Sequence, residues 1–419
     1  MSSSLRRDIE QIYREALEPV RAETAIRANL SWDSESSLLI GGQSVMIGDE
    51  GVYAIAIGKA SVAMISAASG VLGGRFTAGV AVTKAEKSPQ DSRITVIQGS
   101  HPVPDERSLA AGDAVLGFAD LIPDGALVLG LISGGGSALV ESLRQGVGLD
   151  RLRELTSGLL RAGASIHELN AVRSQLSRIK AGGLLDALAR TRVHNLIVSD
   201  VLGDDVRTIA SGPTVPPGST DAASVMRKYG MTGSIPDHAT SNERPMPPTT
   251  IVASLSMALD AAAEHAVVLG YQPYVLTRSI DSEAREAGRL LATILADSVV
   301  SRTSFGPRSC LLAGGETTVT VRGDGVGGRN TEAALAAAIR LAGVETAAIG
   351  FLATDGDDGI SGAAGGIVDG GTVTHDVRDA ARHALDSNDS YTFLNARGAV
   401  LAGGETGTNV NDLVIGLIG

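Results

Sequence analysis

The chain has 419 residues, 43% of them hydrophobic and 20% charged, a composition typical of a globular protein with a substantial core. Lys and Arg number 35 against 47 Asp and Glu, so the formal net charge at pH 7 is −12. An acidic surface argues against a nucleic-acid backbone or an anionic membrane as partner. The length predicts two or three domains.

The N-terminus and the cysteine content restrict the class further. Residues 1–20 lack the apolar core of a signal peptide and are predicted to form an amphipathic helix. No uninterrupted apolar run approaches the length of a membrane span, so we expect a cytoplasmic protein. Cys310 is the only cysteine, which excludes an intramolecular disulfide and a zinc cluster of cysteines. We expect it to be a small buried core residue.

Strand-like and helix-like segments alternate through the first half of the chain. The predicted strands are 52–58, 78–83, 94–99, 126–132 and 194–201. The predicted helices are 59–72, 106–122, 150–163 and 166–179. Alternation of this kind is typical of parallel sheets with crossover helices.

Two proline-rich stretches, 212–220 and 241–250, interrupt this pattern and predict a domain boundary nearby. We divide the chain into 1–245 and 246–419. In the second part the predicted helices are 255–270 and 282–301, and the predicted strands are 309–321 and 347–356.

The strand 126–132 runs directly into the loop Ser133–Ser137, in which Gly134, Gly135 and Gly136 are consecutive. Glycines allow backbone to approach a ligand closely, and free N–H groups attract anions. The loop is no dinucleotide fingerprint, because Leu139 occupies its sixth position, and no P-loop, because the Gly-Lys-Ser/Thr sequence is absent. An unclassified anion cradle is predicted, with tight strand–helix packing as the alternative.

Lys59 follows the strand 52–58 at the predicted start of a helix. The helix macrodipole disfavours a cation there, and a residue that opposes local preference is a good functional candidate. A solvated surface lysine is the alternative.

Four polar residues recur at spacings of three and four within 170–180, namely Asn170, Arg173, Ser177 and Lys180. This spacing predicts that they share one helix face. Two cations and two neutral donors on one face would suit a carboxylate or phosphate, although an ordinary solvated face is the alternative.

Further along, a glycine-interrupted segment leads to Arg329 and Asn330, which open an alanine-rich helix. An arginine beside the free N–H groups of a helix start is predicted to clamp an anion.

Carboxylates gather at the ends of several predicted strands: Asp200, Asp204, Asp205, Glu316, Asp355, Asp357 and Asp358. Carboxylates beside cationic anion cradles favour magnesium-assisted phosphoryl transfer, in which a base takes the hydroxyl proton. His101 is the one histidine near a predicted loop site, and the pattern indicates neither a Ser-His-Asp triad nor a histidine-rich metal site.

Taken together, these stretches resemble the class II glycerate kinases, the glycerate 2-kinases whose C-terminal region is called the MOFRL domain. The resemblance runs in order from about residue 50 to the C-terminus. Its strings are IGKAS, SHPVPDERS, LISGGGSAL, LNAVRSQLSRIKAGGLL, VSDVLGDDVRTIASGPTV, GGETTVTVRGDGVGGRNTEAAL, ATDGDDG and TGTNVNDL.

The resemblance implies transfer of the ATP γ-phosphate to the 2-hydroxyl of D-glycerate, with Mg²⁺. It also implies an α/β fold of two domains, a larger Rossmann-like three-layer domain with a parallel sheet and a smaller α/β MOFRL domain. The active site is expected in the cleft between them. The expected partners are small molecules, with no nucleic acid and no membrane, and a homo-oligomer is compatible with the family.

By resemblance, Lys59 and Arg329 lie at the reaction centre and Ser133–Ser137 is the family's glycine loop. With the clusters above, the predicted site has the following members. Catalytic roles go to Lys59, Arg329 and Asp200; nucleotide binding to Ser133, Gly134, Gly135, Gly136, Ser137 and Asn330; substrate binding to His101, Asn170, Arg173 and Lys180; metal binding to Asp204, Glu316 and Asp355.

Two positions depart from the family pattern: Glu405 stands where proline is expected, and Ala181 where glycine is frequent. Two other functions are weighed against the kinase. Relatives of the family have been labelled hydroxypyruvate reductases, so an NAD(P)-dependent reductase is one. A sensor that binds a nucleotide or sugar acid without turnover is the other.

Overall fold

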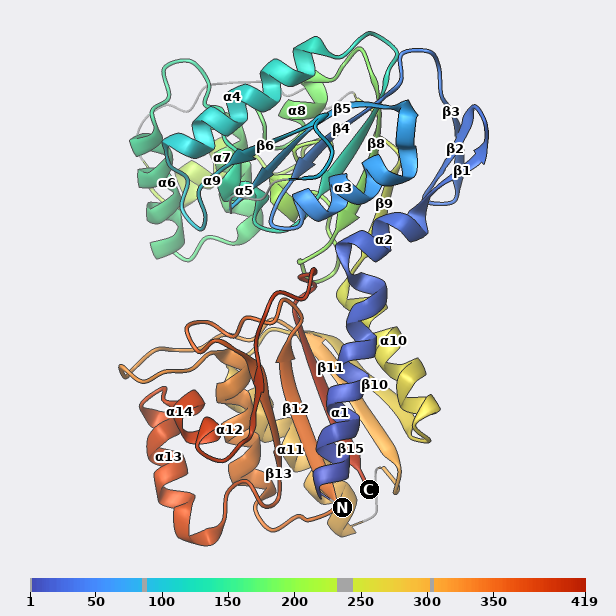
Figure 1. The fold of residues 1–419 in the computed structure, drawn as a ribbon. Helices are drawn as coiled ribbons and strands as arrows, with labels where there is room; N and C mark the ends of the chain where they lie inside the picture. Colours follow the sequence, from blue (N-terminus) through green and yellow to red (C-terminus); the bar gives the residue numbers. More distant parts are fainter. Residues whose placement is uncertain (1, 85–88, 232–243, 302–304) are drawn as a thin grey trace. The chain divides into compact units, whose positions relative to one another are not determined.

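The computed structural model describes residues 2–84, 89–231, 244–301 and 305–419, and the chain divides into two compact units. One unit is Ala22–Val252, and the other combines Met1–Arg21 with Ala253–Gly419 (Figure 1). Within the described residues the sheets comprise two of six strands and one of three. The predicted α/β fold with two domains is confirmed.

The Ala22–Val252 unit is built on a sheet with the order β6-β5-β4-β7-β8-β9. Its strands are β4 (Val52–Ile57), β5 (Phe76–Thr83), β6 (Ile94–Gln98), β7 (Leu127–Ile132), β8 (Arg192–Val198) and β9 (Thr249–Ala253). The pairs β4/β5, β4/β7, β5/β6 and β7/β8 are parallel, as the alternating pattern predicted. β4 and β7 read as apolar runs, and β8 does so from Leu196 onward, because strands covered on both faces bury nearly every side chain.

This strand order is that of a doubly wound sheet, with the chain winding outward from β4 through β5 to β6 and, in the other direction, from β7 to β8. The order reverses between β4 and β7. In open sheets of this kind, ligands bind beyond the carboxyl ends of the strands at such a switch point. Ile57 and Ile132 pair at this end of the two strands, so the segments that follow them emerge side by side.

The remaining elements of this unit surround the sheet. They are α2 (Ala22–Asn29), a small antiparallel sheet of β1 (Leu30–Ser34), β2 (Ser37–Ile40) and β3 (Gln43–Met46), α3 (Ser61–Leu72), η2 (Gly73–Arg75), α4 (Glu106–Leu121), α5 (Gly136–Leu139), α6 (Leu149–Arg161), α7 (Ile166–Leu176), α8 (Gly183–Ala187), η3 (Ile209–Ser211) and α9 (Ala222–Lys228).

The second unit has a sheet with the order β10-β11-β15-β12-β13-β14. Its elements are α1 (Ser2–Leu17), η1 (Glu18–Val20), α10 (Leu255–Val268), β10 (Gln272–Ile280), α11 (Ala284–Ser301), β11 (Ser309–Gly315), α12 (Arg329–Leu341), β12 (Ala347–Ala353), β13 (Ala363–Asp369), η4 (His375–Val377), α13 (Arg378–Asp386), α14 (Ser390–Asn395), β14 (Val400–Ala402) and β15 (Asp412–Ile418).

The sheet of this second unit is mixed, unlike the parallel sheet predicted for the first. Only β10/β11 is parallel among its described strand pairs, and β11/β15, β12/β15, β12/β13 and β13/β14 are antiparallel. The last strand, β15, inserts between β11 and β12 in the opposite direction. The predicted strand 309–321 also ends early, at Gly315.

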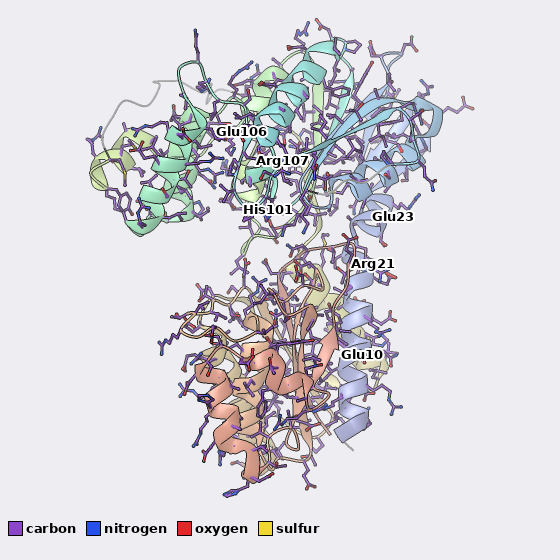
Figure 2. The ribbon with its side chains drawn as sticks, turned by 60° about the vertical axis from the view of Figure 1, so that its left-hand side comes forward. Glu10, Arg21, Glu23, His101, Glu106 and Arg107 are labelled. Carbon is purple, nitrogen blue, oxygen red and sulfur yellow. The ribbon has the colours of Figure 1, made fainter. Side chains whose placement is uncertain are left out.

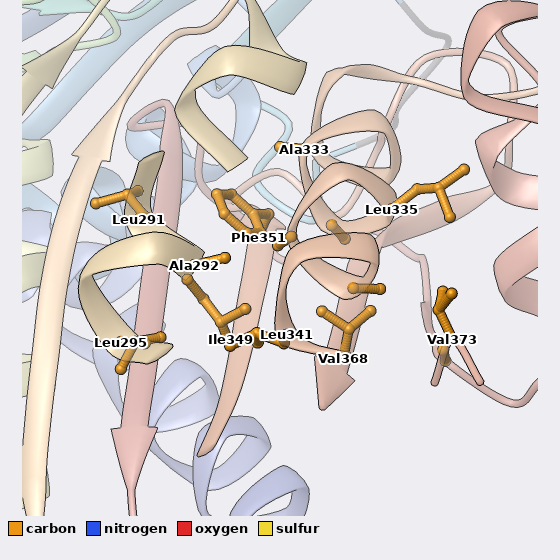
Figure 3. Close-up of a cluster of buried hydrophobic side chains, with 14 of the residues drawn as sticks. Leu291, Ala292, Leu295, Ala333, Leu335, Leu341, Ile349, Phe351, Val368 and Val373 are labelled. Atoms are coloured by element: carbon orange, nitrogen blue, oxygen red, sulfur yellow. The ribbon is translucent and has the colours of Figure 1, made fainter. Parts of the chain in front are cut away.

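The N-terminal helix α1 belongs to the second unit, where it contacts β12, β15 and α10. Its buried residues Leu5, Ile9, Ile12 and Ala16 recur at the spacing of one helix face. Helices α11 and α12 pack against each other and bury side chains such as Leu295 against Ile349 and Phe351 of the sheet (Figure 3).

The division between the units therefore differs from the boundary drawn at 245/246. The chain crosses between units at Arg21–Ala22 and at Val252–Ala253. Arg6 ties α1 to Asp369 through an ion pair of 2.6 Å, which explains why the first residues belong with the C-terminal part. The proline-rich stretch 212–220 is no boundary, since its first residues are buried inside the Ala22–Val252 unit. Of the stretch 241–250, residues 241–243 lie outside the described ranges.

Two simpler expectations are confirmed. Cys310 is fully buried on β11, and burial raises the pKa of its thiol to about 12. Among the described residues, no helix has the length and apolar character required to cross a bilayer.

Candidate functional site

The glycine loop follows β7 at the switch point, and the turn that carries Lys59 follows β4 beside it. Backbone N–H of Lys59 donates to the carbonyl of Gly134 at 2.9 Å. The N–H of Ala60 donates to Ser133 Oγ at 3.1 Å. These bonds join the two segments directly, so Lys59 and the glycine loop form one structural element. Helix α3 begins at Ser61, two residues later than the predicted start at Lys59.

The three glycines of the loop are required for different reasons. A Cβ at Gly134 would lie 1.8 Å from Asp200 Oδ2, and a Cβ at Gly136 would lie 2.6 Å from Ala210 Cβ. Both positions must therefore be glycine because of packing within the unit. Gly135 has φ +80°, a left-handed conformation that favours glycine. Tight packing, the alternative to an anion cradle, therefore explains Gly134 and Gly136 but does not explain Gly135.

Gly135 faces the two side chains predicted to bind anion and substrate. A Cβ built on it would lie 3.2 Å from Lys59 Cγ and 3.3 Å from His101 Cδ2. Figure 2 labels His101 in the loop that leads into α4. Burial, with smaller contributions from Lys59 and Lys84, lowers the pKa of His101 and so favours its neutral imidazole. The structure thus brings Lys59, His101 and the glycine loop together.

The far end of the loop is held by polar side chains. Ser137 Oγ and Ser211 Oγ are 2.7 Å apart, and Ser211 Oγ donates to Asn170 Oδ1 at 3.2 Å. Arg173 Nη2 donates to the carbonyl of Ser137 at 3.0 Å, while its buried Nε has no hydrogen-bond partner among the described residues. Asn170 and Arg173 of α7 therefore lie at the glycine loop.

Part of this framework has an unusual backbone. Ala210, Ser211 and Gly212 have φ of 51°, 61° and 59°, and Ala181 has φ 49°. Non-glycine residues in this region are strained and are found preferentially at functional sites. Ala181, which stands where the family frequently has glycine, thus adopts a conformation that glycine would favour.

The predicted shared helix face does not extend to Ser177 and Lys180. Helix α7 ends at Leu176, because Ser177 pairs with Leu143 in an antiparallel bridge. Lys180 is 1% exposed, and its Nζ is 2.5 Å from Oε2 of the buried Glu141. The ammonium group of Lys180 is thus already paired with an internal carboxylate. The expectation that Lys180 presents its charge on a helix face to a substrate was wrong.

The three carboxylates predicted after β8 differ in position. Asp200 lies against the backbone of the glycine loop, as the packing of Gly134 requires. Asp204 has φ 57° in the following turn, where its N–H donates to the carbonyl of Val201. Asp205 accepts a hydrogen bond from the N–H of Arg207 and so caps the next turn.

In the second unit, Arg329 lies at the end of the sheet where β11 and β12 terminate. Its Nε and Nη2 donate to Asp412 at 2.5 and 3.0 Å, and its Nη1 donates to Glu316 at 2.9 Å. Burial lowers the pKa of Arg329, but its carboxylate neighbours outweigh this effect and raise the pKa overall. Burial also raises the pKa of Asp412, against the opposing effect of Arg329.

The N-terminus of α12 is no free anion clamp, contrary to expectation. The carboxylate of Asp358 accepts hydrogen bonds from the N–H groups of Asn330 and Thr331, both at 2.8 Å. It also accepts from Asn330 Nδ2 at 3.3 Å. The helix start is therefore already occupied by a side chain of this chain. Asn330 is 3% exposed and serves this internal network.

The predicted metal ligands do not form a cage. Within the described ranges, no group of three or more His, Cys, Asp or Glu side chains is placed to hold a metal ion. Glu316 is paired with Arg329, and Asp355 Oδ1 accepts a hydrogen bond from the N–H of Asp357. Mg²⁺ commonly binds one or two carboxylates together with substrate phosphates, so these residues still fit a metal that arrives with a nucleotide.

Sequence reasoning missed Ser211, Glu141 and Asp412. Ser211 and Glu141 carry no local signal, because their roles depend on contacts with residues distant in the chain. Asp412 does carry one, since it lies in the string TGTNVNDL immediately before a run of apolar residues. Glu405, the departure before that string, is exposed.

Comparison with known proteins identifies relatives over nearly the whole chain. Residues 8–242 match a model described as a domain of unknown function, DUF4147, and residues 309–412 match the MOFRL family. A protein of Thermotoga maritima named D-glycerate 2-kinase is 42% identical, covering 88% of this chain and 90% of the relative.

A protein of Agrobacterium vitis named putative hydroxypyruvate reductase is 38% identical over 87% of this chain and 86% of its own length. The crystal structure of glycerate kinase from Thermotoga maritima matches with a TM-score of 0.87 and 38% identity, covering 100% of both chains.

Proposed function

The chain belongs to the family of glycerate kinases that carry a MOFRL domain, and from this membership we propose that it transfers the γ-phosphate of ATP to the 2-hydroxyl of D-glycerate. The product is 2-phosphoglycerate. The chain is an enzyme, a kinase with an alcohol group as acceptor. ATP as donor, the position of the hydroxyl and the need for Mg²⁺ are parts of the proposal.

The arrangement around Gly135 is the observation that carries the proposal furthest. A backbone that only glycine favours lies beside the lysine Lys59 at the switch point of a doubly wound sheet. Helix α5 has only four residues, so the attraction for phosphate comes from the lysine and from close backbone approach. In a chain with a net negative charge, Lys59 and the side-chain-free backbone of Gly135 thus lie together at the point where such folds bind nucleotides.

The proposed roles follow from the chemistry of phosphoryl transfer. Lys59 and Arg329 would offset the negative charge on the transferred group, and the loop would hold the other phosphates. Asp200, packed against Gly134, would accept the proton of the attacking hydroxyl. His101, Asn170 and Arg173 would bind the sugar acid.

Mg²⁺ would neutralise phosphate charge when it arrives with ATP. Asp204, Glu316 and Asp355 remain the proposed carboxylate ligands, of which one or two suffice beside phosphate oxygens and water. Of these, Glu316 also contacts Arg329, so metal binding there would release one of the arginine's partners.

An ADP-release assay across D-glycerate, tartronate, threonate and erythronate tests the proposal. We expect ADP formation with ATP and Mg²⁺ to be fastest with D-glycerate. The same protein with NADH and hydroxypyruvate should consume no NADH, since Leu139 breaks the dinucleotide fingerprint. NADH oxidation without ADP release would favour the reductase, and nucleotide binding without either reaction would favour a sensor.

A further inference from the structure

A buried ion pair lies behind the glycine loop. Glu141 and Lys180 are 0% and 1% exposed, and Lys180 Nζ is 2.5 Å from Glu141 Oε2. Nζ also donates to the carbonyl of Val140 at 3.3 Å. The other carboxylate oxygen, Oε1, accepts from Ser177 Oγ at 2.5 Å and from the N–H of Ser142 at 3.1 Å. Both charges are thus fully engaged inside the unit.

Such a pair is not explained by stability alone. Removing two charges from water offsets most of their attraction, and apolar residues of similar volume are often as stable. The better-attested use of buried charges is to fix one arrangement among several. The contacts of this pair indicate which arrangement that is.

From Lys180 the contacts lead to the strained segment around Ser211. The N–H groups of Ala181 and Gly182 donate to the carbonyls of Ser211 and Gly212, both at 2.9 Å. Ser211 Oγ in turn contacts Ser137 Oγ. The turn after Lys180 therefore fixes the segment at Ser211, and Ser211 in turn contacts Ser137 at the end of the glycine loop.

From Glu141 the contacts lead back to the same loop. Glu141 follows Ser137 by four residues through the short helix α5, which begins at Gly136. Glu141, Lys180, the turn at Ala181, Ser211 and Ser137 thus form a closed ring. The ion pair closes this ring by joining the segment after α5 to the segment after α7. Arg173 of α7 also donates a hydrogen bond to the Ser137 carbonyl.

We infer that Glu141 and Lys180 are positioning residues for the phosphates of the nucleotide, acting through the ring that fixes Ser137 and the glycine loop. The inference rests on the proposed function, in which that loop binds ATP. The pair touches no substrate. Its loss should allow the loop to relax, because the conformations at Ala181 and Ser211 are unfavourable unless neighbouring contacts impose them.

The test uses a double variant, Glu141→Gln with Lys180→Met, which removes both charges of the pair together. ATP affinity is measured by calorimetry on protein that thermal melting shows to be folded. We expect the dissociation constant for ATP to rise at least about tenfold, since losing one hydrogen bond to a charged phosphate costs about tenfold or more in affinity. Arg6→Met, which removes an ion pair of the other unit, should lower the melting temperature without changing ATP affinity.

A second variant covers the case in which the double variant does not fold. Ser177→Ala keeps both charges but removes the hydroxyl that donates to Glu141 and accepts from the N–H groups of Ile179 and Lys180. It should raise the ATP dissociation constant in the same direction by a smaller factor. Lys180→Arg, which retains a cation, should retain more ATP affinity than Lys180→Met.

The outcomes separate this inference from the proposed function. Suppose that the wild-type protein binds ATP and phosphorylates glycerate, and that the folded variants bind ATP equally well. The ion pair would then be only a structural feature, and this result would overturn the inference but not the proposed function. Wild-type protein that binds no ATP would overturn the proposed function and the inference that rests on it.

Discussion

The guanidinium of Arg329 is held by the carboxylate of Asp412 through two hydrogen bonds, Nε to Oδ2 at 2.5 Å and Nη2 to Oδ1 at 3.0 Å. Asp412 begins β15 and pairs with Gly315 and Ala353, so it lies between the ends of β11 and β12. Bidentate pairing fixes the plane of the guanidinium as well as its position. The orientation of Arg329 is therefore set by the sheet.

Replacing Arg329 with Ala should lower kcat about 10²–10³-fold if it stabilises charge on the transferred phosphoryl group. Asp412→Asn should lower kcat less, by roughly tenfold to 10²-fold, because the arginine remains but loses its fixed orientation. Steady-state kinetics with ATP and D-glycerate measure both effects.

If Asp412 acts only through Arg329, the two substitutions will not be additive. The double variant should then have the kcat of Arg329→Ala alone. Multiplicative losses would mean that Asp412 has a separate role, and a wild-type kcat for Arg329→Ala would remove the arginine from the reaction.

Lys59 is expected to act in the chemical step from the other unit. Lys59→Met keeps the length of the side chain and removes its charge, and kcat should fall about 10²–10³-fold. Arg190→Met removes an exposed cation of the same unit, one that pairs with the exposed Asp124, and is the control, expected to retain wild-type kcat. Equal kcat values for the two variants would contradict the role of Lys59.

Gly135 and Gly117 form a matched pair of glycine-to-alanine substitutions. Gly135→Ala places a side chain at φ +80° beside Lys59 and His101, so both the stability and the affinity for ATP should fall. Gly117 lies exposed in α4 with open space around it, and Gly117→Ala should stabilise the protein by about 0.5–1 kcal/mol with unchanged ATP affinity. Calorimetry and thermal melting distinguish the two, and unchanged ATP affinity in Gly135→Ala would return the loop to a packing role.

Acid should weaken the attachment of α7, the helix that carries Asn170 and Arg173. The carboxylate of Glu168 accepts hydrogen bonds from Lys228 Nζ, the N–H of Ser165 and the Tyr229 hydroxyl, and Lys228 makes the largest contribution to lowering its pKa from 4.5 to about 2. A lowered carboxyl pKa stabilises the folded state above the unfolded value, and this contribution is lost as pH falls from 4.5 towards 2.

The matching variant is Glu168→Gln. Its stability deficit relative to wild type, measured by urea unfolding, should be largest at neutral pH and should shrink as the carboxylate is protonated. A deficit that stays constant from neutral pH down to about pH 3 would show that the charge of Glu168 is irrelevant to α7.

The first half of the fold could be predicted because β4, β7 and the second half of β8 are buried on both faces and therefore read as apolar runs. In the second half, β13 has the sequence AAGGIVD, in which small residues and glycines hide the strand. The antiparallel insertion of β15 depends on pairing between distant segments, which periodicity does not report. The mixed sheet was missed for that reason.

The site shows the same division between local and tertiary information. The glycine loop and Lys59 were found because each follows a recognisable strand, and a doubly wound sheet brings such ends together. Lys180 was misplaced because helical spacing continues in the sequence after α7 has ended at Leu176. Its partner Glu141 lies in another segment of the chain, and nothing local identifies a buried ion pair between them.

The position of the new phosphate on the product tests the central claim most directly. The protein is incubated with ATP, Mg²⁺ and D-glycerate, and the product is offered to enolase, which uses 2-phosphoglycerate but not 3-phosphoglycerate. We predict immediate formation of phosphoenolpyruvate, in a constant proportion to the ADP released. ADP release with no phosphoenolpyruvate until a phosphoglycerate mutase is added would show that the 3-hydroxyl is phosphorylated and would contradict the account.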